Sequence, residues 1–476
     1  MGSNNKRFSL RKEEKVKLTA NILFSGIGCQ ERGFRDSGLF DIEVLNTSDI
    51  NKESVLSYAA IHCNMTNEMV NEYKDYPSRE EMAQYLTDIN LGYDPEKNKQ
   101  FDWFKLVKRK KNDLEKYWLA CKLTHNLGDI TKIEDLPYAD FWTVSFPCQS
   151  ISVAGKMKGL KPDSGTRSSL LWDNIRLLSK AKENNKLPQY IMFENVKNLV
   201  SKKFIDDFND LLDVLDELGF NSYWSVINGK DCGIPQSRER VFVISIRKDI
   251  DNSKYTFPKP FDTGVRLKEI LETQVDEKYY LSDKKVQKFL KTIDLSQFYK
   301  NDNELHQLGY INDYNGDANR IYLNNVARTL KSEAGGGGAK TGWYTMNNES
   351  ITGLISDQGT KFEKETEYAN TLLARDYKGF GNQAMNAVIS GLFEMIRIRK
   401  LTPRECYRLM GLTFEDCDKA AKLGVADTHL YKQAGNGIIT NCCALLAEHL
   451  YKAQYDDTYL CTDEGYQGNF TKPQAE

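Results

Sequence analysis

The stretch TVSFPCQSIS, residues 143–152, constrains the fold of this chain more than any other. A β-branched and aromatic run ends at Phe146, and Pro147 then stops the strand because it lacks the N–H group that a sheet needs. Cys148 therefore follows the carboxyl end of a strand, where open α/β enzymes hold their chemistry. A single cysteine is more often a small buried hydrophobe, so this interpretation depends on other stretches of the chain.

A second strand-like run, LTANILFSG, breaks on glycines and leads into FSGIGCQERG, residues 24–33. Its Gly26, Gly28 and Gly33 keep the G-x-G shape of a dinucleotide fingerprint but not its spacing. Glu31 would also repel a pyrophosphate. A turn that admits a ligand without favouring phosphate suits a nucleoside that carries an amino acid. A plain strand-turn-helix is the alternative.

Acidic residues end two further runs. FDIEVLNTSDI ends at Asp49 and Ile50, about 20 residues downstream of the first turn, where an acid grips ribose hydroxyls in such folds. Alternatively, Asp49 caps the helix that follows it. Asp129, which precedes Ile130, is placed to accept a hydrogen bond from an adenine amino group.

Between these acids lies a segment, residues 62–126, that is rich in charge and aromatic rings. It contains the basic run KLVKRKK, residues 105–111. The flanking aromatic residues are Phe101, Trp103, Phe104, Tyr117 and Trp118. Basic residues interleaved with aromatic ones fit a surface that lies along a nucleic-acid backbone. A solvated helical face is the alternative.

A second candidate catalytic group follows the strand-like run QYIMFENV, which ends in Glu194 and Asn195. An acid at that place is costly to bury without a purpose. Further on, QSRER sets Arg238 and Arg240 before a β-type run. Alternate residues of a strand share a face, so one arginine can pair with Glu194 while the other reaches a carbonyl or a phosphate.

The loop after Cys148, residues 154–166, carries glycines and lysines and suggests a lid over an anionic substrate. From about residue 255 the pattern loosens, and two stretches each place a Thr-Leu pair before glycine. We interpret this part as a small domain rich in loops that probes a groove. Compact character returns at residue 396, where Thr402 is expected to cap a helix with Pro403 in its first turn.

Composition sets the remaining bounds. A chain of 476 residues exceeds one core, so we expect one large domain and a smaller one. The 65 basic and 67 acidic residues nearly balance, which neither indicates nor excludes a polyanion partner. The 10 cysteines form no CxxC pair or Cys/His cluster, so we expect reduced thiols and no metal site. With no long apolar run and no signal peptide, the protein should be cytoplasmic.

Taken in this order, the stretches resemble the DNA (cytosine-5)-methyltransferase family. FSGIGCQERG looks like its cofactor loop, SFPCQ its nucleophile segment, ENV its acid segment, QSRER its arginine segment and GNGI its last cofactor element. The basic insert and residues 164–173 are also similar to bacterial CpG-type members such as those of mollicutes. Two positions depart from the pattern: Cys29 stands where many members have a glycine, and Ala154 where some have a serine.

This resemblance implies an α/β fold with two parts. The first is a Rossmann-like S-adenosylmethionine-dependent methyltransferase domain with a mostly parallel sheet, over residues 18–254. The second is a smaller, irregular target-recognition domain over residues 255–395, after which residues 396–455 return to the catalytic domain.

The resemblance also implies the reaction, in which a methyl group passes to carbon 5 of a cytosine. The Cys148 thiolate adds at carbon 6 and makes carbon 5 nucleophilic. Glu194, with a raised pKa, holds a proton for ring nitrogen 3. Arg240 binds the base carbonyl and Arg238 supports the acid. The target base must leave the stacked duplex first.

The resemblance also implies which residues bind the cofactor and which bind DNA. It implies no metal site. Those expected to hold S-adenosyl-L-methionine, and its product S-adenosyl-L-homocysteine, are Phe24, Ser25, Gly26, Ile27, Gly28, Asp49, Ile50, Asp129, Ile130, Pro147, Asn436 and Gly437. Those expected to contact DNA are Gln149, Ser152, Lys156, Lys158, Arg167, Arg328, Thr329, Leu330, Gly335, Gly336, Thr371 and Leu372.

The expected partner is double-stranded DNA, and no membrane partner is expected. We expect a monomer in the bacterial cytoplasm that has a restriction-modification or orphan role. A cognate restriction endonuclease is a second candidate partner. Two alternatives remain open. A tRNA cytosine methyltransferase would share the catalytic parts, although the sizeable recognition region argues against it. A DNA-binding regulator without activity would not need Cys148, Glu194 and Arg240 intact.

Overall fold

The computed structural model describes most of the catalytic part of the chain and pieces of the region that follows it. The described residues are 15–95, 97–109, 112–147, 170–280, 282, 302–310, 319–331, 341–345, 398–460 and 465–466. Ten of the predicted site residues lie outside them: Cys148, Gln149, Ser152, Lys156, Lys158, Arg167, Gly335, Gly336, Thr371 and Leu372.

A six-stranded sheet with the order β2-β1-β3-β4-β7-β5 forms the centre of the molecule. Its strands are β1 (Val16–Leu23), β2 (Phe40–Ser48), β3 (Phe141–Val144), β4 (Tyr190–Val196), β5 (Phe220–Asn228) and β7 (Glu239–Arg247). β2, β1, β3 and β4 pair in parallel, and β7 is antiparallel to both of its neighbours. The expected α/β fold with a mostly parallel sheet is confirmed.

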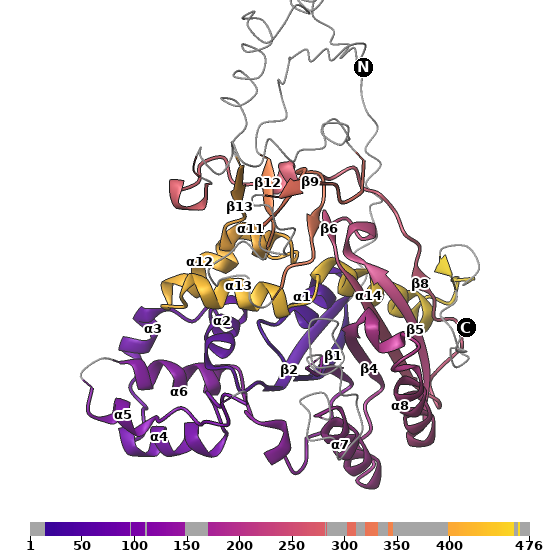
Figure 1. Ribbon diagram of the computed structural model, residues 1–476. Coiled ribbons are helices and arrows are strands. Elements are labelled where there is room, and N and C mark those ends of the chain that lie inside the picture. Colours follow the sequence, from indigo (N-terminus) through magenta and orange to yellow (C-terminus); the bar gives the residue numbers. More distant parts are fainter. Residues whose placement is uncertain are drawn as a thin grey trace, which may run out of the picture.

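Helices cover both faces of this sheet, so its strands are buried on two sides. Successive residues of β3 alternate between two cores: Phe141 packs on one face and Trp142 on the other. The first core includes α1 (Cys29–Asp36) and α14 (Thr440–Tyr455), and the second includes α7 (Leu171–Glu183) and α8 (Ile205–Leu218). Figure 1 shows α1 and α14 above the sheet and α7 and α8 below it.

Glycines act at two of these helices. A Cβ on Gly33 of α1 would collide with the Cβ of Cys443 and the carbonyl of Thr440, so this glycine allows α1 and α14 to pack closely. Gly219, with a φ of 108°, ends α8 in the left-handed conformation that glycine favours. Thr402 and Pro403 begin α11 (Pro403–Arg408), as predicted. Two more helices, α12 (Phe414–Lys422) and α13 (Asp427–Asn436), lie between α11 and α14.

The insert is a group of helices at the lower left of Figure 1. It follows α2 (Lys52–His62) and consists of α3 (Asn67–Glu72), α4 (Arg79–Asp88), α5 (Phe104–Val107) and α6 (Asp113–Leu123). Trp103 and Trp118 are 0% and 7% exposed, so they build the core of this group and are not available to stack on bases. Phe104, Lys105, Lys108 and Arg109 are exposed, and a nucleic-acid role for the basic run stays a prediction.

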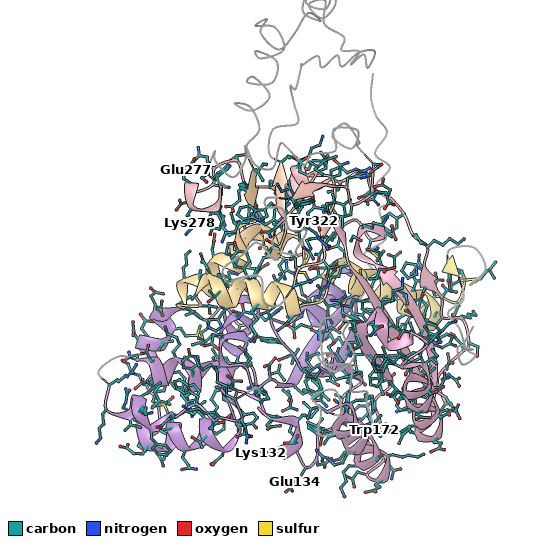
Figure 2. The ribbon with its side chains drawn as sticks, in the orientation of Figure 1. Lys132, Glu134, Trp172, Glu277, Lys278 and Tyr322 are labelled. Atoms are coloured by element: carbon teal, nitrogen blue, oxygen red, sulfur yellow. The ribbon has the colours of Figure 1, made fainter. Side chains whose placement is uncertain are left out.

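A small four-stranded sheet lies at the top of Figure 1, where Figure 2 labels Tyr322. Its order is β13-β12-β10-β9. These strands are β9 (Gln307–Tyr310), β10 (Arg320–Tyr322), β12 (Trp343–Thr345) and β13 (Ile398–Lys400). The small sheet thus takes one strand from the segment that we expected to return to the catalytic domain, and the proposed domain limits stay a prediction.

Short elements complete the described structure. β11 (Ala327–Arg328) pairs with β6 (Gln236–Ser237), and β14 (Gly465–Tyr466) pairs with β8 (Phe257–Pro258). Single 3₁₀ turns occur at Ile130–Lys132, Lys197–Val200, Gly229–Asp231, Leu267–Ile270 and Glu277–Tyr279. None of the helices in the described ranges combines the length and the apolar character that crossing a membrane requires.

Candidate active site

The site lies where the strand order reverses. After β1 the chain crosses to β2 on one side, and β3 later joins β1 on the other side. Open α/β sheets bind ligands at such a switch point, outside the carboxyl ends of the strands. The turn after β1 and the loop after β3 meet here, because Gln30 Nε2 donates to Ser145 Oγ at 3.1 Å.

The turn after β1 is held by the end of β2. The Ser25 N–H donates to the Ser48 carbonyl at 3.1 Å, and the Gly26 N–H donates to Asp49 Oδ2 at 2.9 Å. Gly26 has a φ of 54°, and a Cβ there would meet open space. At Gly28, with a φ of 78°, a Cβ would collide with His62. Both glycines are therefore required by backbone conformation, and the first leaves room for a ligand.

Asp49 is positioned by Asn126, a side chain that sequence reasoning did not single out. Asn126 Oδ1 accepts the Asp49 N–H at 2.9 Å, and its Nδ2 donates to the Asp49 carbonyl at 3.0 Å. The alternative that Asp49 caps α2 is wrong. Asn51 is the cap and accepts the Ser54 N–H at 2.9 Å. Asp49 instead ties the turn after β1 to β2.

Asp129 lies beside the same strand end, because Ser48 Oγ donates to the Gly128 carbonyl at 2.7 Å. Its Oδ1 accepts the Thr131 N–H at 3.0 Å and the Thr131 hydroxyl at 2.9 Å. Its Oδ2 accepts Asn90 Nδ2 at 2.8 Å. The two acids predicted to bind an adenosyl group thus come from neighbouring loops at one edge of the sheet.

Glu31 does not face a ligand. It is fully buried and accepts the Tyr58 hydroxyl, and it lies 2.8 Å from His62 Nδ1 and 3.2 Å from Arg35 Nη1. Burial raises the pKa of Glu31, but the His62 and Arg35 charges outweigh that effect and lower it. The other ring nitrogen of His62 contacts the Ile27 carbonyl at 3.0 Å. His62 and Arg35 therefore balance the charge of Glu31 beneath the turn that follows β1.

The other residues predicted to hold the cofactor differ in exposure. Ile27 and Ile130 are 2% and 3% exposed, so only their backbone can reach a ligand. Asn436 ends α13 and is exposed. A Cβ on Gly437 would lie 3.3 Å from Cys29 Sγ, which places this last element beside α1. The half-buried members are Phe24, Ile50 and Pro147.

The end of β4 is joined to the nucleophile segment. Val144 of β3 pairs with Phe193, so Glu194 and Asn195 come directly after the last paired residues. Asn195 Nδ2 donates to the Phe146 carbonyl at 3.0 Å. This bond fixes the backbone two residues before Cys148, which lies outside the described residues.

Glu194 forms an ion pair with Arg240, with 3.1 Å between Oε1 and Nε. Burial nevertheless raises the pKa of Glu194, because it outweighs the Arg240 and Arg238 charges, which lower it. A carboxyl group in this state retains a proton more readily than an exposed glutamate does. The expected direction of its pKa is confirmed.

Arg238, which we expected to support the acid, acts on Glu194 through its charge, while the ion pair of Glu194 is made by Arg240. The Arg238 guanidinium donates to the carbonyls of Leu330, Gly435 and Gly437 at 3.0, 3.0 and 2.7 Å, and so joins three segments of the chain. Arg240 takes the supporting role through its ion pair. Arg238 lies just before β7, where the carbonyls of Leu330, Gly435 and Gly437 surround its guanidinium. Its donors are therefore used by these carbonyls.

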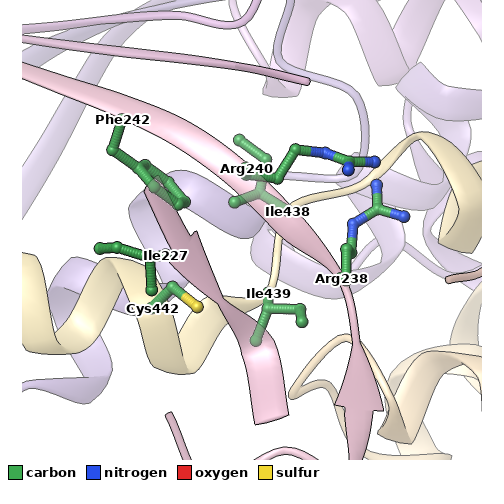
Figure 3. A pocket seen from close by; sticks show the side chains of 7 residues that line it. All are labelled: Ile227, Arg238, Arg240, Phe242, Ile438, Ile439 and Cys442. Atoms are coloured by element: carbon green, nitrogen blue, oxygen red, sulfur yellow. The ribbon is translucent and has the colours of Figure 1, made fainter. Parts of the chain in front are cut away.

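A pocket adjoins this pair of arginines. It is lined by Ile227, Arg238, Arg240, Phe242, Ile438, Ile439 and Cys442. Figure 3 shows the two guanidinium groups turned to the same side above apolar side chains, as the alternation of strand residues predicts. Arg240 Nη1 donates to the Glu239 carbonyl at 2.7 Å, while no bond of its Nη2 is found within the described structure.

The profile of the C-5 cytosine-specific DNA methylase family matches residues 78–452. The chain belongs to this family. It is 34% identical over 441 residues to a type II methyltransferase of Lactococcus lactis subsp. cremoris, which covers 90% of this chain and 98% of that protein. It is 33% identical over 302 residues to an orphan methyltransferase of Spiroplasma monobiae, covering 62% and 74% of the two chains. The resemblance seen in the five motifs is confirmed.

A solved methyltransferase of Entamoeba histolytica is similar in fold, with a TM-score of 0.50 and 15% identity over 92% of this chain and 99% of that one. The methylase transfers a methyl group to carbon 5 of cytosine in DNA. Dependence on S-adenosylmethionine follows from the family.

Three residues that we expected to face DNA are placed elsewhere in the methylase. Arg328 and Leu330 are 8% and 2% exposed, and the Thr329 hydroxyl donates to the Ser237 carbonyl at 2.6 Å. They join the small sheet region to the arginine segment, through the pairing of β11 with β6. A contact of these residues with DNA stays a prediction.

The loops of the methylase fit an adenosyl group better than a phosphate. Residues 24–28 contain no basic side chain, and Gly26 faces open space through which a ligand can approach the backbone. The loops that flank this turn contribute the carboxylates of Asp49 and Asp129, which accept hydrogen bonds from hydroxyl and amino groups. Both carboxylates would repel a phosphate.

Proposed function

We propose that Cys148 and Glu194 of this methylase act on a single cytosine flipped out of duplex DNA. The observation that carries the proposal is the hydrogen bond from Asn195 to the Phe146 carbonyl. It joins the residue after Glu194 to the backbone two residues before Cys148. The strand that ends in Glu194 and the described backbone that leads to Cys148 thus lie side by side, and both functional groups would border one base.

The chemistry requires both groups. Carbon 5 of cytosine is too weak a nucleophile to take a methyl group directly, but a thiolate that adds at carbon 6 converts the ring to an enamine. Glu194 would hold a proton at ring nitrogen 3 and so favour this addition, as its raised pKa allows. Carbon 5 then forms its bond to the methyl group and loses its own proton to water. The bond between Cys148 and carbon 6 breaks, which restores the ring double bond and the thiolate, and the proton at ring nitrogen 3 returns to Glu194.

Arg240 would serve both the acid and the base. Its Nε contacts Glu194, and its Nη2 is left to donate to the cytosine carbonyl. Arg238 would act through structure, since its three carbonyl contacts hold the last cofactor element and the Leu330 segment together. Its charge still lowers the pKa of Glu194 and so limits how strongly the proton is retained.

S-adenosylmethionine would supply the methyl group on a positively charged sulfur, as an electrophilic carbon. Asp49 would accept hydrogen bonds from the ribose hydroxyls, and Asp129 would accept one from the adenine amino group. Residues 24–28 would approach it through their backbone, and Asn436 would border its far side. Supporting this placement, the Gly26 N–H already holds the Asp49 carboxylate and Asn90 the Asp129 carboxylate.

We also infer that the substrate is double-stranded, that the enzyme is a cytoplasmic monomer, and that it serves a restriction-modification system or acts as an orphan. The Lactococcus relative is a type II methyltransferase, and the Spiroplasma relative is an orphan one. A cognate restriction endonuclease is therefore one candidate partner.

A trapping experiment tests the proposed chemistry. A pool of duplexes with 5-fluorocytosine in place of cytosine is incubated with the full chain and S-adenosylmethionine. Fluorine cannot leave carbon 5 as a proton does, so the adduct to the enzyme should survive denaturing electrophoresis. Peptide mapping should place the DNA on Cys148, and Cys148→Ser should give no adduct.

Cys63→Ser is the matched control, because Cys63 is a partly exposed thiol far from the strand ends in the sequence. It should give as much adduct as the wild type. An adduct on a different cysteine, or an adduct formed by Cys148→Ser, would refute the proposal.

A further inference from the structure

Residues 88–92 of the insert, between α4 and α5, contact both loops that carry the acids. The Gly92 N–H donates to the Ile50 carbonyl at 2.7 Å, and the Asp129 N–H donates to the Ile89 carbonyl at 3.0 Å. Lys132 Nζ donates to the Asp88 carbonyl at 2.7 Å. Figure 2 labels Lys132 at the lower edge of the molecule, beside the helices of the insert. The insert therefore borders the site proposed for the adenosyl group.

Residues 88–92 pack closely against the loop that carries Asp129. A Cβ on Gly128, which has a φ of 73°, would collide with the Ile89 carbonyl. Leu91 is fully buried, and its carbonyl accepts Trp103 Nε1 and Gln100 Nε2, both at 2.8 Å. The segment is thus anchored in the core of the insert on one side and pressed against the Asp129 loop on the other.

Asn90 is the side chain of this segment that reaches an acid. It has a φ of 57°, and its Nδ2 donates to Asp129 Oδ2 at 2.8 Å. Thr131 supplies two donors to the other oxygen, Oδ1. A carboxylate accepts about four hydrogen bonds, two at each oxygen. The three donors thus fix its plane and leave one acceptor position, on Oδ2 beside Asn90.

We infer that Asn90 makes the methylase select a purine with an amino group at carbon 6, by orienting the Asp129 carboxylate. The inference rests on the proposed placement of the adenosyl group at Asp129. An amino group donates to the remaining acceptor position, whereas a carbonyl oxygen there would face the carboxylate with no proton between them. Without Asn90 the carboxylate is held only at Oδ1, by Thr131, so Oδ2 loses its fixed direction and the preference for the amino group should fall.

The variant that isolates this effect is Asn90→Gly. Glycine adopts the positive φ of residue 90 without strain, so the substitution removes the amide and leaves the backbone unstrained. Asn98→Gly is the matched control. Asn98 lies in the same insert, has a φ of 47° and accepts the Tyr93 hydroxyl at 2.6 Å, and it has no bond to a carboxylate of the described residues.

The experiment compares the affinities of two ligands for the full chain by calorimetry. One is S-adenosylhomocysteine, and the other is S-inosylhomocysteine, in which a carbonyl replaces the amino group. The wild type and Asn98→Gly should prefer the first by more than about 100-fold. In Asn90→Gly this ratio should fall by about tenfold, as the loss of one orienting hydrogen bond to a charged group predicts.

The ratio distinguishes selection from a general structural role. If both affinities fall together in Asn90→Gly and the ratio stays at the wild-type value, the inference is overturned. If the wild type itself shows no preference, the placement of adenine at Asp129 is wrong, and the proposed function loses its adenosyl site. A wild-type preference that only Asn90→Gly loses supports both.

Discussion

Arg240 and Glu194 form a diagonal ion pair across two antiparallel strands, with 3.1 Å between Nε and Oε1. Arg240 pairs in register with Val196, and Glu194 with Phe242, so the two charged side chains lie two positions apart on one face of the sheet. The contact supports the acid but does not lower the pKa of Glu194 to its ordinary value, because burial dominates.

Glu194→Gln should reduce methyl transfer by at least about 100-fold, because the amide keeps the size of the side chain but cannot deliver a proton. Single-turnover assays with labelled S-adenosylmethionine measure the rate, and DNA affinity should stay unchanged. Glu239→Gln is the control, since Glu239 lies on the neighbouring strand and pairs with Lys197 in solvent. Equal rates in the two variants would contradict the role of Glu194.

The stability of Glu194→Gln should depend on pH differently from that of the wild type. Burial raises the pKa of Glu194 above 4.5, so the folded protein holds this proton more tightly than the unfolded chain does. Binding of this proton therefore stabilises the folded state. That stabilisation is complete at low pH and is lost as the pH rises through the raised pKa of Glu194. The glutamine variant has no such loss.

Chemical denaturation from about pH 5 to about pH 8 measures this difference. We expect the free energy of unfolding of the variant to rise relative to the wild type across that range. An advantage of the wild type that grows with pH would mean that Arg240 stabilises the carboxylate more than burial destabilises it.

The two arginines should respond differently to the same substitution. Arg238→Lys should lower the free energy of unfolding by about 2 kcal/mol, because a compact ammonium group cannot span three carbonyls. Arg240→Lys should leave stability within about 1 kcal/mol and slow methyl transfer by about tenfold, because it loses the donor for the base. The opposite pattern in thermal unfolding and methyl transfer would restore Arg238 as the partner of the acid.

Gly26→Ala and Gly28→Ala separate ligand binding from folding. A Cβ on Gly26 meets open space, so we expect a loss of stability of about 1 kcal/mol from the positive φ and a larger, at least tenfold, loss of affinity for S-adenosylhomocysteine. Gly28→Ala should cost more than about 2 kcal/mol, because its Cβ would collide with His62 and Tyr58. Unchanged affinity in Gly26→Ala would place the ligand elsewhere.

The strands and their polar ends were predictable from the sequence. Apolar runs that stop at a proline, a glycine or an acid mark β1, β3 and β4, and the groups at Asp49 and Glu194 follow from where these runs end. The cap of α11 was predictable for a similar reason, because Thr402 and Pro403 make a local signal. Each of these features depends on residues close together in the chain.

The supporting residues were not predictable in that way. Asn90 and Asn126 contact acids that lie 39 and 77 positions away, and nothing in their own neighbourhood indicates those partners. The tryptophans of the insert were misleading for a related reason. A ring beside lysines has the same sequence pattern whether it stacks on a base or fills a core, and Trp103 fills a core.

The most direct test of the central claim is methyl transfer to duplex DNA by Cys148→Ala. With tritiated S-adenosylmethionine, the wild type should label the DNA and the variant should label none of it, while both bind the duplex with the same affinity. Label transferred by Cys148→Ala at the wild-type rate would mean that no thiolate adds to the cytosine at this position.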